Sequence, residues 1–183
     1  VDAATLTLDE TLALLQDGVD LRVILVMDIS NGADVVMARP DIANVQALRG
    51  KRIAVENATV GAVMLDAMLN ASGLDINDIT LVSKTVNEHT EAYLKRQVDA
   101  VITFEPVRSE LLHHGARILF DSSQIPGRII DVLVVQADAM TQHEQALRSL
   151  VAAHFKALDY QAQQPDDAAR RIAPYLGVKA DAV

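Results

Sequence analysis

The chain has 183 residues, of which 50% are hydrophobic and only 3% aromatic, and its formal net charge is −9. This length suits one domain or two small ones, and the acidic balance argues against a nucleic-acid partner, whose phosphates need a basic surface. Because the sequence has no cysteine, disulfides, thiolate metal sites and a cysteine nucleophile are excluded.

The first half of the chain alternates predicted helices and strands. Leucine spacing predicts a helix over 8–16, with Thr7 and Glu10 as a capping box at its start. Because so regular a helix stands close to the first residue, we expect that upstream sequence belongs to the same domain. Further along, the patterns predict strands at 20–28, 33–39, 51–56 and 78–83, a helical turn before Gly50, and a helix over 60–73.

The second half continues this alternation. We expect strands at 98–105, 116–121 and 128–136, and helices over 87–97, 106–115, 139–162 and 165–177. Two of these helices begin with proline, which suits the first helical position. Alternating strands and helices predict an α/β fold with mostly parallel strand pairing.

Candidate functional residues follow the predicted strands. In open parallel sheets, ligands bind beyond the carboxyl ends of the strands, beside the N-termini of the next helices. Polar residues occur at four such points: Asp28 to Gly32, Glu56 to Thr59, Thr103 to Glu105, and Asp121 to Ser123. The fingerprints of dinucleotide-binding domains, P-loop proteins and α/β-hydrolases are absent from the sequence.

Glu56 and Glu105 each end a predicted buried strand, where a carboxylate is costly unless it is paired. They suggest a polar cavity for a ligand with an amine or N–H donors. The alternative is structural pairing, with Lys51 for Glu56 and with Arg108 for Glu105.

Thr59 precedes a predicted helix and has two possible roles. It is a normal N-cap residue, or it binds an anionic or carbonyl group together with the backbone N–H groups of Val60 and Gly61. Gly61 would allow a ligand to approach the backbone closely.

The histidines predict no metal site. His113 and His114 end a helix, where positive charge is favourable in any case. His154 lies on an apolar stripe and reads as a core residue, whereas His89 and His143 are expected to be exposed.

Three segments together resemble a known family: "SNGADVVMARPDI", "LRGKRIAVENATVGAVMLDAML" and "VDAVITFEPVRSELLHHGARILFDSSQIPGRIIDVLVV". They are similar to the solute-binding proteins of ABC importers for nitrate, sulfonates and taurine, a group that includes binding proteins for pyrimidine and thiamine precursors. The resemblance covers nearly the whole chain. It implies a two-lobed, type II periplasmic-binding-protein fold with the ligand in the cleft between the lobes.

The resemblance also implies a division of the chain. Lobe one would take residues 1–48 and 130–183, and lobe two residues 49–129. The crossovers would fall near Arg39–Gly50 and Gly127–Asp131, with Asp131 at the hinge. The expected ligand-binding residues are Asn31, Gly32 and Asp34 from lobe one, and Glu56, Asn57, Thr59, Val60, Gly61, Thr103 and Glu105 from lobe two.

The implied function is transport rather than catalysis. The protein would be a periplasmic or otherwise extracytoplasmic binder without a cofactor, with two partners: a small solute (a sulfonate, a taurine-like zwitterion or a pyrimidine) and the membrane permease of an importer. Alternatives are a ligand-sensing domain of a signalling protein, an enzyme like the pyrimidine-precursor synthases of the same fold, and an unrelated doubly wound domain. Those synthases use clustered cysteine and histidine residues, and this sequence has no cysteine.

The sequence departs from the family at its N-terminus. Family members begin with a signal peptide and about two further strand–helix units of lobe one, and these have no counterpart here. We therefore expect an incomplete lobe one with an exposed sheet edge, and possible self-association of the chain.

Overall fold

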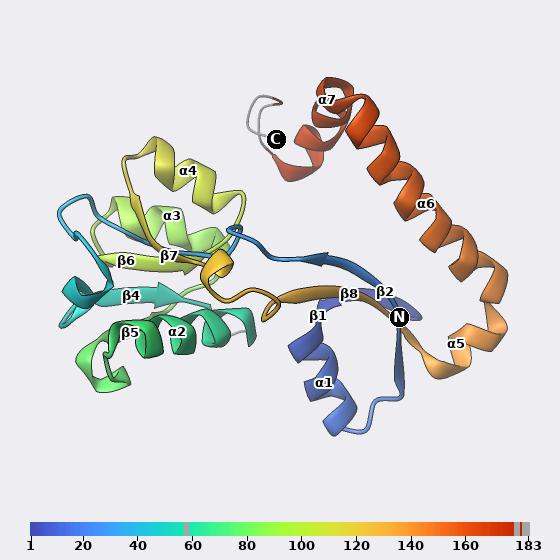
Figure 1. The fold of residues 1–183 in the computed structure, drawn as a ribbon, viewed down its shortest axis with the longest axis horizontal. Coiled ribbons are helices and arrows are strands. Elements are labelled where there is room, and N and C mark those ends of the chain that lie inside the picture. The colour runs from blue at the N-terminus through green and yellow to red at the C-terminus, as the bar shows by residue number, and fades with distance from the viewer. Residues whose placement is uncertain (57–58, 178–179, 181–183) are drawn as a thin grey trace.

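The computed structural model describes residues 1–56, 59–177 and 180, and its strands form two separate sheets (Figure 1). In the three-stranded sheet, β8 (Ile130–Gln136) lies between β1 (Ala3–Thr7) and β2 (Leu21–Ile29) and is antiparallel to both. β8 is the most buried strand of this sheet, as its apolar sequence predicts. β1 was not expected, because its sequence Ala-Ala-Thr-Leu-Thr has little apolar character and depends on β8 for its hydrogen-bonding partners.

The helix α1 (Leu8–Gln16) follows β1 directly and begins as predicted. The N–H of Glu10 donates to Thr7 Oγ1 at 3.3 Å, and the N–H of Thr7 donates to Glu10 Oε2 at 3.0 Å. This reciprocal pair satisfies two N–H groups at the start of the helix. The capping box is therefore confirmed.

The second sheet has five strands in the order β5 (Thr80–Ser83), β4 (Arg52–Val55), β6 (Ala100–Thr103), β3 (Val35–Ala38) and β7 (Arg117–Asp121). β4 is parallel to β5 and β6, but β3 is antiparallel to β6 and β7. The expectation of mostly parallel pairing is therefore wrong. A short apolar strand that is buried on both faces, such as β3, carries no information about its direction.

Helices cover both faces of the five-stranded sheet (Figure 1). Ile53 and Val55 of β4 pack towards α2 (Thr59–Ser72), whereas Ala54 between them packs towards α3 (Val86–Leu94) and α4 (Val107–His113). This alternation follows from the two-residue period of a strand. The short 3-10 turns η1 (Val45–Leu48) and η2 (Ile76–Asp78) precede β4 and β5.

The chain crosses between the two sheets twice. It leaves β2 through residues 30–34, and it returns from β7 through η3 (Ser122–Gln124) and residues 125–129 to β8. We expected the first crossing near Arg39–Gly50, with residues 1–48 in lobe one. That boundary is wrong for β3, because β3 pairs with β6 and β7 and the crossing therefore precedes it.

The carboxyl-terminal helices lie outside both sheets, and the last of them turns back towards α4 (Figure 1). The single helix expected over 139–162 is two helices, α5 (Ala137–Gln142) and α6 (Glu144–Gln163), separated at His143, whose φ of −128° is not helical. α6 has no buried residue, so His154 is half-buried rather than a core histidine. α7 (Pro165–Leu176) begins with proline, as predicted.

Candidate functional site

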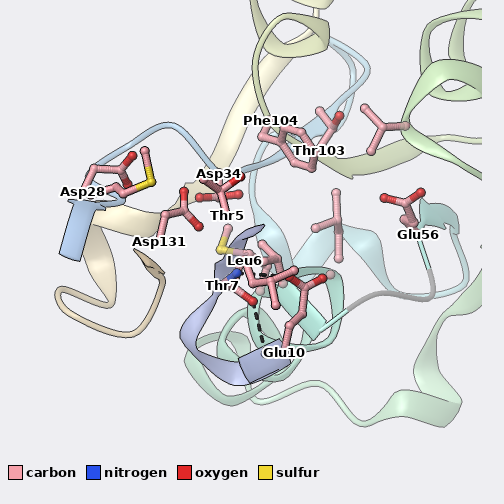
Figure 2. A pocket seen from close by; sticks show the side chains of 16 residues that line it. Thr5, Leu6, Thr7, Glu10, Asp28, Asp34, Glu56, Thr103, Phe104 and Asp131 are labelled. Carbon is pink, nitrogen blue, oxygen red and sulfur yellow. Dashed lines mark hydrogen bonds between the residues drawn. The ribbon is translucent and has the colours of Figure 1, made fainter. Parts of the chain in front are cut away.

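A cavity of about 410 Å³ lies between the two sheets (Figure 2). The elements of the three-stranded sheet and α1 contribute Thr5, Leu6, Thr7, Glu10, Met27, Asp28 and Asp131 to its wall. Asp34, from the first crossing, and the elements of the five-stranded sheet contribute the remainder: Glu56, Val60, Gly61, Met64, Val86, Ile102, Thr103 and Phe104. The cavity therefore takes residues from both structural units of the chain, that is, from the three-stranded sheet with α1 and from the five-stranded sheet with its helices.

Two neighbouring parallel strands, β4 and β6, end at this cavity. Glu56 directly follows β4, and Thr103 is the last residue of β6. Ligand sites in parallel sheets form at such ends. The hydroxyl of Thr103 is buried at this wall and has no hydrogen-bonding partner among the described residues.

Gly61 brings α2 close to the end of β4. A Cβ atom on this residue would lie 2.5 Å from the carbonyl oxygen of Glu56 and 2.8 Å from Cγ2 of Val55. Both distances are below normal contact, so a side chain does not fit here without a shift of the helix. Gly61, one of the expected ligand-binding residues, lines the cavity, and the close packing of α2 on β4 already requires a glycine here.

Hydrogen bonds join the two crossings beside the cavity. Ser122 Oγ lies 2.7 Å from Ser30 Oγ and accepts from the N–H of Gly32 at 2.7 Å. Ser30 Oγ also donates to the buried carboxylate of Asp34 at 2.5 Å, and the N–H of Ser122 donates to the carbonyl oxygen of Asp34 at 2.9 Å. The segments that connect the two sheets are thus fastened to each other at one point.

Asp131 and Asp28 face each other across the β2–β8 pairing. Burial and the negative charges of Asp28, Asp34 and Glu10 raise the pKa of Asp131 to about 6. Burial also raises the pKa of Asp34, partly offset by its hydrogen bond from Ser30. Like charges directly opposite each other in a sheet are destabilising, so this side of the cavity concentrates negative charge at a cost in stability.

His89 lies behind the Glu56 side of the cavity, on α3. It was expected to be exposed but is completely buried, because it shares the inner face of α3 with Ala92 and Tyr93. Its Nε2 lies 3.2 Å from the carbonyl oxygen of Lys84, and burial lowers its pKa, so the ring is neutral at pH 7.

Glu105, a predicted ligand residue, does not line this cavity. Its carboxylate accepts from Arg108 Nη1 at 2.9 Å and from the N–H of Ser109 at 3.1 Å. It therefore caps α4 and forms an ion pair on the surface, which is the structural alternative that the sequence left open.

The structure brings six of the expected residues to the cavity: Asp34, Glu56, Val60, Gly61, Thr103 and Asp131. Asn31 is exposed, and Gly32 donates its N–H to Ser122 at the crossing. Neither residue lines the cavity. Asn57 and the side chain of Thr59 lie outside the described residues.

Sequence reasoning missed the contribution of β1 and α1, namely Thr5, Leu6, Thr7 and Glu10. The only signal there was the capping box, which located the start of the helix but not its neighbours in space. Asp28 was recognised as a strand end. Met27 lines the cavity beside it because the β2–β8 register shifts between Val26 and Asp28, an irregularity that strand periodicity does not reveal.

The lining of the cavity contains no lysine, arginine or histidine within the described chain. In the same residues, no group of three or more histidine, aspartate and glutamate side chains is arranged to hold a metal ion. None of the described helices combines the length and the apolar character required to cross a bilayer.

The family model of NMT1/THI5-like proteins matches residues 1–168 of the chain. A binding protein of Brucella abortus (strain 2308) is 20% identical over 150 residues, which are 80% of this chain and 47% of that protein. The chain thus spans about half the length of this relative.

Two solved structures share the fold. The periplasmic aliphatic sulphonate binding protein SsuA of Escherichia coli matches with a TM-score of 0.84 and 19% identity, over 100% of this chain and 63% of that one. The desulfurization enzyme DSZB matches with a TM-score of 0.77 and 19% identity, over 100% of this chain and 70% of that one. These matches confirm the predicted α/β class and the type II periplasmic-binding-protein fold, of which the chain covers a part.

Proposed function

Because the chain belongs to the NMT1/THI5-like family, we propose that it is a solute-binding component of an ABC importer. The cavity between the two sheets carries this proposal, since it takes side chains from both units and adjoins both crossings. A solute that contacts both units favours the arrangement in which they close on it. The membrane permease of the importer would then recognise the closed form on the extracytoplasmic side.

The residues proposed to contact the solute are those that line the cavity at the strand ends. Asp34 approaches from the first crossing, Asp131 from β8, and Glu56, Gly61 and Thr103 from the elements of the five-stranded sheet. In this proposal Asp131 also marks the hinge, because it follows the return crossing directly. The solute is a small organic molecule; sulfonates, taurine-like zwitterions and pyrimidines are the starting candidates.

The likeness to DSZB raises an enzyme as a second candidate. A cysteine nucleophile cannot come from this chain, because the sequence contains none. An enzyme on this scaffold would thus need carboxylates or hydroxyls for its chemistry. Solute binding requires only the cavity and the two crossings, and we therefore favour it.

A thermal-shift panel tests the proposal. Solutes of each class are added to the protein and to the variant Thr5→Trp, whose side chain would occupy the cavity from an exposed position on β1. A ligand at one hundred times its dissociation constant stabilises the folded protein by about 2.7 kcal/mol. Stabilisation of the parent protein but not of the variant is the expected result. Equal stabilisation of both proteins would locate binding elsewhere and contradict the proposal.

A further inference from the structure

The cavity is acidic on both sides. Five carboxylates line it, namely Glu10, Asp28, Asp34, Glu56 and Asp131, and the described lining has no basic side chain to balance them. None of these five belongs to an ion pair found within the described residues. Nine of the described lysine and arginine side chains pair with carboxylates elsewhere, such as Arg108 with Glu105.

Two of the five carboxylates have structural roles. Glu10 accepts from the N–H of Thr7 in the capping box, and Asp34 accepts from Ser30 at the crossing. The other three, Asp28, Asp131 and Glu56, remain for a ligand. Asp28 and Asp131 lie on one side of the cavity and Glu56 on the other (Figure 2).

Building on the proposed solute-binding function, we propose that the cavity selects a small organic cation, with an ammonium or amidinium group, over a free sulfonate. The cation would donate its N–H groups to Asp131 and Asp28, or to Glu56. Such charge-assisted hydrogen bonds are stronger than neutral ones, and they would relieve the repulsion between the two facing aspartates.

The apolar part of the lining favours an organic cation over a bare metal ion. Met27, Met64 and Ile102 offer hydrophobic contact, and the Phe104 ring, 39% exposed, offers an aromatic face for a cation. A metal ion needs several oxygen ligands converging within bonding distance. The described residues contain no such cluster, and Glu56 lies across the cavity from Asp28 and Asp131.

The same carboxylates would repel the negative charge of a sulfonate. A sulfonate would place negative charge between three carboxylates without a guanidinium or ammonium group in the described lining to compensate. A zwitterion with both groups remains compatible, provided that its cationic end enters the cavity. The sulfonate ligand named for SsuA is therefore not carried over into this proposal.

Calorimetry with matched probes tests this inference. Benzamidine, benzamide and benzenesulfonate share a ring and differ in charge, and butylamine, butanol and butanesulfonate repeat the comparison on an aliphatic body. We expect each cation to bind at least tenfold more tightly than its neutral and anionic counterparts. Glu56→Gln and Asp131→Asn should each reduce the affinity for a cation by at least threefold.

Glu105→Gln is the matched control, because Glu105 also follows a strand of the same sheet but lies outside the cavity. It should leave the affinity for the cations unchanged. Tighter binding of the sulfonates, or equal loss of cation affinity in Glu105→Gln, would overturn the inference and leave solute binding intact. If neither these probes nor the wider panel binds, the proposed function itself fails.

Discussion

Replacing Asp131 with asparagine should make the protein more stable at neutral pH. Asp131 faces Asp28 directly across β2 and β8, and Asp34 and Glu10 add further negative charge. These charges and burial raise its pKa from 3.8 to about 6. Asparagine has nearly the same shape but carries no charge, so the substitution removes the repulsion and retains the packing.

The expected magnitude follows from the pKa of Asp131. A rise from 3.8 to about 6 corresponds to about 3 kcal/mol at 1.36 kcal/mol per unit. Asp131 is only half-buried, and screening by solvent reduces this value to about 1 kcal/mol. For a chain of this length, the melting temperature of Asp131→Asn should rise by about 2–4 °C.

The sign of the pH dependence provides an independent check. Because the pKa is raised in the folded state, the folded protein binds the proton more readily than the unfolded chain. The stability contributed by the protonated carboxyl is complete below about pH 4 and is lost as the pH rises through about 6. The stabilising effect of Asp131→Asn should therefore be larger at pH 7.5 than at pH 5.

Thermal unfolding followed by circular dichroism at both pH values measures these effects. Asp159→Asn, on the exposed surface of α6, is the control and should change the melting temperature little at either pH. Once Asp131→Asn is present, Asp28→Asn should add almost nothing, since the two relieve the same repulsion. A lower melting temperature for Asp131→Asn at pH 7.5, or an equal rise at both pH values, would refute the reasoning.

Three further substitutions test the framework around the cavity by thermal and urea unfolding. Gly61→Ala places a Cβ 2.5 Å from the carbonyl oxygen of Glu56 and should lower the free energy of unfolding by about 1–3 kcal/mol. Asn70→Ala, on the exposed side of α2, is the control and should cause no measurable loss. Equal effects of the two substitutions would contradict the packing role of Gly61. Ser122→Ala removes two hydrogen bonds between the crossings and should cost about 1–3 kcal/mol, and an unchanged urea midpoint would mean that water replaces the hydroxyl. Thr7→Ala removes the cap of α1 and should cost about 1 kcal/mol, with Thr7→Ser retaining most of that stability as the control.

The sequence predicted the helices and most strands because their signals are local. The capping box of α1 and the proline at the start of α7 depend on residues a few positions apart, and both are confirmed. The pairing of strands is not local in this way. The apolar run of β3 fits either sheet and either direction, and its neighbours β6 and β7 come more than sixty residues later.

The candidate site was predictable only in part, for a related reason. Glu56 and Thr103 could be assigned because parallel strands end at a common edge. Glu105 could not be assigned correctly, because an acidic residue at the start of a helix can also serve as a cap. Its carboxylate here accepts from the N–H of Ser109 and from Arg108. The sequence did not indicate a strand at β1, so the contribution of β1 to the cavity could not be predicted either.

The central position of β8 has a consequence for the order in which the protein folds. All strands of the five-stranded sheet have been synthesised once residue 121 is added to the chain, whereas β1 and β2 must wait for β8, which begins at residue 130. Closing a loop of about one hundred residues or more is slow, so the antiparallel pairs of β1 and β2 with β8 should form last. Until then, the backbone N–H and C=O groups of β2 lack their pairing strand, and this stage of biosynthesis is where aggregation or capture by a chaperone should compete with folding.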